Sequence, residues 1–109
     1  MVRVLIAGDD PDELGSALES HGATVAYVAG TANRPALEEA GVLDAAVLVI
    51  TDVGLATSIV VANDLNPNLR IVVYSRDSLP EFAKGLAGHI LDPELLDVET
   101  VASELTESS

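Results

Sequence analysis

The fold is indicated by the stretch "VLIAGDDPDELGSAL", residues 4–18. It begins with an apolar run that stops at Gly8, as expected of a strand covered on both faces of a sheet. Acidic residues follow, and then apolar residues recur at helical spacing, at Leu14, Ala17 and Leu18. The stretch therefore predicts a strand, an acidic turn and a helix, which together open a parallel α/β sheet.

Strand and helix patterns alternate in this way to the end of the chain. Apolar runs predict strands at residues 2–7, 23–29, 45–51, 70–75 and 89–91. Helical patterns predict a first helix that ends at Gly22 and further helices at about 35–40, 55–65, 79–86 and 92–105. Right-handed crossovers then give a three-layer α/β fold with a five-stranded parallel sheet in the order 2-1-3-4-5, of reduced Rossmann or flavodoxin-like type. Residues 1–105 are expected to form a single domain, with a frayed tail at 106–109.

The charge of the chain is unusual for its size. Its 109 residues include 18 acidic and five basic side chains, a formal net charge of −13. Such a domain repels itself in dilute buffer, and molar salt removes most of that repulsion. The composition is typical of cytoplasmic proteins of halophilic archaea; the alternative is an acidic mesophilic protein or the partner of a basic protein. The composition argues against nucleic-acid binding, which needs clustered Lys and Arg. The apolar runs are too short for membrane insertion, and the absence of cysteine excludes disulfides and thiolate chemistry.

Parallel sheets bind ligands outside the carboxyl ends of their strands, where the strand order reverses. In the predicted order this place lies between strands 1 and 3. Four segments are expected at that edge of the sheet: residues 8–12, 30–33, 51–54 and 75–77.

Three interpretations of the acidic turn "GDDPDELG" remain open. In the first, Asp10 caps the helix with Pro11 as its first residue, and Glu13 completes a capping box. In the second, Gly8 and Gly15 belong to a phosphate-binding turn, although their spacing departs from that of a dinucleotide fingerprint and the carboxylates would repel a diphosphate. In the third, the acidic residues hold a metal ion.

The metal interpretation rests on three carboxylates that follow neighbouring strands. Asp9 and Asp10 come after strand 1 and Asp52 after strand 3, and hard oxygen ligands of this kind suit Mg²⁺. The arrangement resembles the response-regulator receiver domain, in which such a cluster surrounds a phosphorylated aspartate. Ser75 matches the hydroxyl residue that this resemblance implies after strand 4. Asp92 stands where a receiver has its lysine, before a proline.

A second resemblance covers residues 30–101. The segments "GTANRPALEEAGVLDAAVLVITD" (30–52), "VVANDLNPNLRIVVYSRD" (60–77) and "LAGHILDPELL" (86–96) resemble the TrkA-N/RCK domain of potassium-transport regulators. That resemblance implies a regulatory or small-ligand sensing module with a nucleotide as the expected ligand. Further candidates are Mg²⁺, which belongs to the metal interpretation, and K⁺. The resemblance also implies a homodimer or a transporter partner. The candidate ligand-binding residues are Gly8, Asp9, Asp10, Gly30, Thr31, Thr51, Asp52 and Arg76.

No pattern in the sequence predicts an enzyme. His21 and His89 lack partners at metal-ligand or triad spacing, and no serine lies in a nucleophile-elbow motif. Arg76 is equally interpretable as a salt-bridge residue on an acidic surface. Three functional hypotheses therefore remain: a ligand-sensing module, a receiver-like phospho-acceptor that uses Asp52, and a scaffold that acts only through protein contacts.

Overall fold

The computed structural model describes residues 2–10 and 12–107. Five parallel strands form one sheet in the order β2-β1-β3-β4-β5, which confirms the predicted topology. The strands are β1 (Arg3–Ala7), β2 (Thr24–Val28), β3 (Val47–Ile50), β4 (Arg70–Tyr74) and β5 (His89–Leu91).

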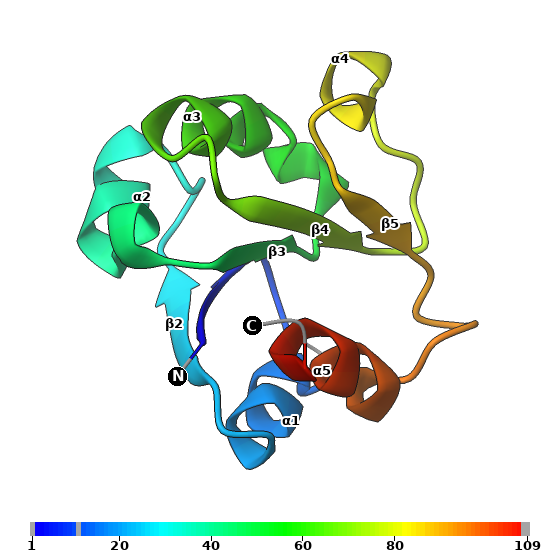
Figure 1. Ribbon diagram of the computed structural model, residues 1–109. Coiled ribbons are helices and arrows are strands. Elements are labelled where there is room, and N and C mark those ends of the chain that lie inside the picture. Colours follow the sequence, from blue (N-terminus) through cyan, green and yellow to red (C-terminus); the bar gives the residue numbers. More distant parts are fainter. Residues whose placement is uncertain (1, 11, 108–109) are drawn as a thin grey trace.

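Helices cover both faces of this sheet. Figure 1 shows α2, α3 and α4 on one face and α1 and α5 on the other. The helices are α1 (Leu14–Ser20), α2 (Arg34–Ala40), α3 (Thr57–Leu65), α4 (Glu81–Lys84) and α5 (Val98–Glu107). Two short 3-10 turns, η1 (Val42–Asp44) and η2 (Val53–Leu55), flank β3.

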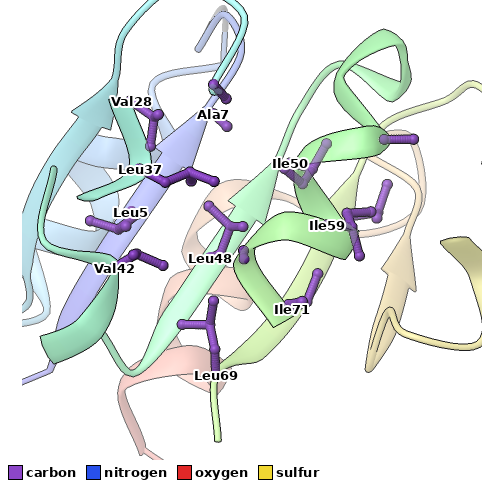
Figure 2. Close-up of a cluster of buried hydrophobic side chains, with 14 of the residues drawn as sticks. Leu5, Ala7, Val28, Leu37, Val42, Leu48, Ile50, Ile59, Leu69 and Ile71 are labelled. Carbon is purple, nitrogen blue, oxygen red and sulfur yellow. The ribbon is translucent and has the colours of Figure 1, made fainter. Parts of the chain in front are cut away.

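The apolar runs form strands because successive side chains point to opposite faces of the sheet and both faces are covered. In β3, Leu48 and Ile50 belong to the buried cluster beneath α2 and α3, whereas Val47 and Val49 belong to the cluster beneath α1 and α5. Figure 2 shows the first of these clusters, in which side chains of β1, β3 and β4 meet those of α2 and α3. The central strands are thereby held in one register, and their carboxyl ends form a common edge.

The last helix begins later than the sequence predicts. Residues 92–96 form a turn, in which Asp92 Oδ1 accepts a hydrogen bond from the Glu94 amide at 2.9 Å, and α5 begins only at Val98. Asp97 caps it, because its Oδ1 accepts from the Thr100 amide at 2.8 Å. At the other end α5 continues to Glu107, so Thr106 is helical and not part of a frayed tail. Ser108 and Ser109 lie outside the described residues.

Two other helices are shorter than predicted. The pattern at 79–86 gives only the single turn of α4. The first helix begins at Leu14, after Glu13 has adopted a left-handed φ of 58°. The proposed role of Pro11 as first helical residue falls outside the described residues. In the described part of the chain, no helix is long and apolar enough to cross a membrane.

Candidate functional site

The carboxyl ends of β1 and β3 are joined by short contacts around Gly8. Gly8 has a φ of 109°, and a side chain there would meet the Thr51 hydroxyl and the Asp52 Cβ. Thr51 donates from Oγ1 to the carbonyls of Ala7 and Asp9, and its amide also donates to Ala7 at 3.0 Å. Gly8 and Thr51 therefore connect the ends of β1 and β3. In this connection the Thr51 hydroxyl already donates to backbone carbonyls.

The carboxylate of Asp10 is the anchor of the acidic turn. Asp10 Oδ1 accepts from the Leu14 amide at 2.7 Å, and Oδ2 accepts from the Gly15 amide at 2.8 Å. Oδ2 also accepts from the Tyr27 hydroxyl at 3.0 Å. Asp10 therefore caps α1, as the first interpretation expects, although it lies four residues before the first helical residue, Leu14. The sequence reasoning missed its second contact, with Tyr27 on β2.

Gly15 fits this packing because it has no side chain. A Cβ at residue 15 would overlap the Tyr27 hydroxyl and lie 3.1 Å from Asp10 Oδ2. The glycine thus makes room for a side-chain contact between α1 and β2. This accounts for Gly15 without a phosphate-binding turn, because the amides that a diphosphate would need already donate to Asp10.

Tyr27 and Tyr74 are protonated more firmly than free tyrosines. Desolvation raises the pKa of Tyr27, although the residue is 57% exposed, and the hydrogen bond to Asp10 raises it further. Burial likewise raises the pKa of Tyr74, whose hydroxyl donates to the Leu96 carbonyl at 2.6 Å. Both hydroxyls therefore act as structural donors.

The three carboxylates of the metal interpretation serve separate contacts. Asp52 Oδ1 accepts from the Gly54 amide at 2.8 Å and caps η2. Asp9 is exposed, and Asp10 points into the α1 cap. Over residues 2–10 and 12–107, no group of three or more acidic or histidine side chains is placed to hold a metal ion. The structure thus brings Asp9 and Asp52 to the same edge but does not assemble Asp9, Asp10 and Asp52 as a ligand set.

At the β4 and β5 side of the edge, polar side chains pair with one another. Ser75 Oγ accepts from the Asp77 amide at 3.1 Å. Arg76 Nε lies 3.2 Å from Glu94 Oε1, and both side chains are exposed. Arg76 is thus in a surface ion pair, the plainer of its two interpretations. His21, for which the sequence offered no partner, lies 3.0 Å from Glu99 of α5.

Of the remaining candidates, Thr31 lines a cavity of about 340 Å³ between α2 and α3. Gly30 is an exposed turn residue beside it. The cavity residues that the sequence reasoning missed include Arg34, the first residue of α2, and Ser58, which is only 4% exposed. No sequence motif marks either residue, because the cavity exists only where two loops pack together.

Known proteins place this fold in a recognisable class. An orphan response regulator from Helicobacter pylori superposes with a TM-score of 0.75 at 12% identity, covering 97% of this chain and 94% of that one. A CheY-like receiver domain from Methanospirillum hungatei gives 0.72 at 15% identity, with 99% and 93% covered. A chain from the complex of histidine kinase ThkA with response regulator TrrA gives 0.69 at 13% identity, with 98% and 97% covered. The fold is that of receiver domains.

The sequence itself matches the family of unknown function DUF7126 over residues 4–105, and the chain belongs to that family. No curated protein matches it in sequence. The resemblance to receiver domains is thus supported at the level of the fold. The resemblance to TrkA-N/RCK domains receives no support from these relatives.

Proposed function

We propose that this chain is a non-catalytic, receiver-like regulatory domain that acts through protein contacts and whose state is not set by phosphorylation. The observation that carries this proposal is the engagement of Asp10 by two backbone amides and one hydroxyl. Removing Asp10 from these donors in order to bind Mg²⁺ would uncap α1, at a cost of about 1 kcal/mol for the cap alone. The acidic turn is therefore interpreted as a structural anchor.

The positive charge of the domain also favours this proposal. The single lysine of the chain, Lys84, lies on α4 and pairs with Glu81 at 2.9 Å. Asp92, which stands where the receiver resemblance implies a lysine, closes a turn with Glu94. A phosphorylated Asp52 would therefore gain no counter-charge from that position, and its acyl phosphate, which is more negative than the carboxylate it replaces, would face the acidic turn across the edge.

Three large apolar side chains are exposed and could form contacts with a partner protein. Phe82, Ile90 and Leu95 are 59%, 49% and 81% exposed. They belong to α4, β5 and the loop after β5, which lie at one end of the sheet (Figure 1). A partner that covers these elements would remove apolar surface from water, at about 25 cal/mol per Å².

The proposal is tested by incubating the protein with acetyl phosphate and Mg²⁺ and measuring its intact mass. A receiver domain with a working phosphorylation site is the positive control, and Asp52→Asn is the matched variant. We expect the wild-type mass to remain unchanged under conditions that phosphorylate the control. A gain of one phosphoryl group that disappears in Asp52→Asn would overturn the proposal. It would establish the second candidate function, a phospho-acceptor, which the exposure of Asp52 at the end of a central strand favours.

A further inference from the structure

The cavity between α2 and α3 differs in charge from the rest of the molecule. Its lining residues are Thr31, Ala32, Asn33, Arg34, Gly54, Leu55, Thr57, Ser58 and Val61. This set contains one cation and no carboxylate. The cavity beside α5, of about 230 Å³, includes Glu104, and the one beside β2, of about 440 Å³, includes Glu39. In a chain with 18 acidic residues, a cavity whose only charged lining residue is an arginine is suited to an anion.

Arg34 is available for such a ligand. Among the described residues, no carboxylate lies within the 4.0 Å ion-pair limit of its guanidinium, whereas Arg76 and Lys84 are paired with glutamates. Its backbone is held at the start of α2, because Asn33 Oδ1 accepts from the Ala36 amide at 3.1 Å. Guanidinium donors match carboxylate and phosphate oxygens in a bidentate geometry.

The walls of the cavity are held in place by Ser58. Its Oγ lies 2.7 Å from the Ala32 carbonyl, to which it donates, and 3.3 Å from the Thr31 carbonyl. Ala32 is fully buried and has a φ of 52°, so the loop is fixed by packing as well as by this hydrogen bond. Leu55 and Val61 add partly buried apolar surface. The site is therefore preformed, which reduces the entropy lost when a ligand binds.

We propose that this cavity binds a small organic anion, with a carboxylate or phosphate head at Arg34 and a short apolar body against Leu55 and Val61. The hydroxyls of Thr31 and Thr57 are the further donors within the lining. A bound ligand would connect the loop before α2 to η2 and the start of α3. The inference does not depend on the proposed function, because none of these residues takes part in the Asp10 anchor.

The probes are phenyl phosphate, benzoate and the neutral benzyl alcohol, each titrated into isotopically labelled protein and followed by amide chemical shifts. We expect both anions, but not the alcohol, to shift the amides of Thr31, Gly54, Thr57 and Ser58. The affinity for the anions should fall as ionic strength rises. Arg34→Gln should weaken binding by about tenfold or more, since it removes a charged hydrogen-bond donor.

Arg76→Gln is the matched control, because it makes the same change in net charge at an ion pair that does not line the cavity, and it should leave the anion affinity unchanged. Asp52→Asn should strengthen binding. The Asp52 carboxylate accepts a hydrogen bond from the amide of Gly54, which lines the cavity, so its negative charge repels an anion there. Equal weakening by Arg34→Gln and Arg76→Gln would show only general electrostatic attraction and would overturn the proposal. So would the absence of saturable shifts up to about 10 mM of either anion.

Discussion

Two regions at the same edge of the sheet are built in opposite ways. At the turn after β1, the Asp10 carboxylate is surrounded by donors from α1 and β2, and Gly15 makes room for them. Between α2 and α3, Arg34 has no carboxylate partner among the described residues and lines an open cavity. The first region is acidic and closed, whereas the second contains an arginine without a carboxylate partner among the described residues and is open.

The difference shows that charge at the end of a strand does not by itself identify a binding site. What matters is whether the charged group already has partners within the protein. A carboxylate with three hydrogen bonds stabilises the fold, and a ligand would have to replace all of them. A guanidinium without hydrogen bonds inside the protein can bind a ligand without first breaking such bonds. Breaking the closed region should therefore affect stability, whereas changing Arg34 should affect binding.

The largest effect is expected from Gly15→Val in the closed region. The new side chain overlaps the Tyr27 hydroxyl and crowds Asp10, so we expect the free energy of unfolding to fall by about 1–3 kcal/mol, as for other overpacked sites. Urea denaturation followed by circular dichroism measures this change. Gly85→Ala is the control, because nothing lies within 4 Å of the position of its Cβ.

A double variant locates the cause. If the overlap with Tyr27 is responsible, Tyr27→Ala should recover much of the loss caused by Gly15→Val, and the two changes should not be additive. An unchanged loss in the Tyr27→Ala background would mean that the valine disturbs something other than this contact.

Asp10→Ala should have the next largest effect. It leaves the amides of Leu14 and Gly15 without their acceptor, and we expect a loss of about 1–2 kcal/mol, measured in the same denaturation experiment. Asp12→Ala is the matched control, because Asp12 is exposed in the same turn and its removal changes the net charge equally. Equal stabilities of the two variants would contradict the anchor role of Asp10.

Much of the fold could be predicted from the sequence because the strands are buried on both faces. Burial on both faces requires apolar runs, which locate the strands, and the right-handed crossovers between parallel strands then limit the strand order. The start of α5 was predicted wrongly because "DP" at 92–93 resembles a helix start. In the structure Asp92 closes a turn with Glu94, and Asp97 is the residue that caps the helix.

The site was predicted less well, because its contacts join residues far apart in sequence. Asp10 could be recognised as a cap from its local pattern, but its bond to Tyr27 spans 17 positions and crosses from the turn to β2. Arg34 and Ser58 face the same cavity from different helices. Periodicity and spacing report only which face a residue occupies, so they could not show which charged groups have partners.

The smallest expected effect concerns the ionisation of Tyr27. Because desolvation and Asp10 raise its pKa above the usual value of about 10, the folded state retains this proton more firmly than the unfolded chain does. This contribution to stability is fully present below about pH 10 and is lost as pH rises through the higher pKa of the folded state. Asp10→Asn removes the neighbouring charge and should lower that pKa.

The tyrosinate absorbance, titrated in the folded protein, measures both tyrosines together, and Tyr27→Phe leaves the signal of Tyr74 alone. The difference between the two titrations gives the pKa of Tyr27. A Tyr27 that titrates at its usual value, with no response to Asp10→Asn, would show that its hydroxyl does not donate to Asp10 in solution. The closed region would then be held only by the hydrogen bonds from the Leu14 and Gly15 amides to Asp10. The contrast with the open cavity would depend on these two bonds and not on a contact between Asp10 and β2.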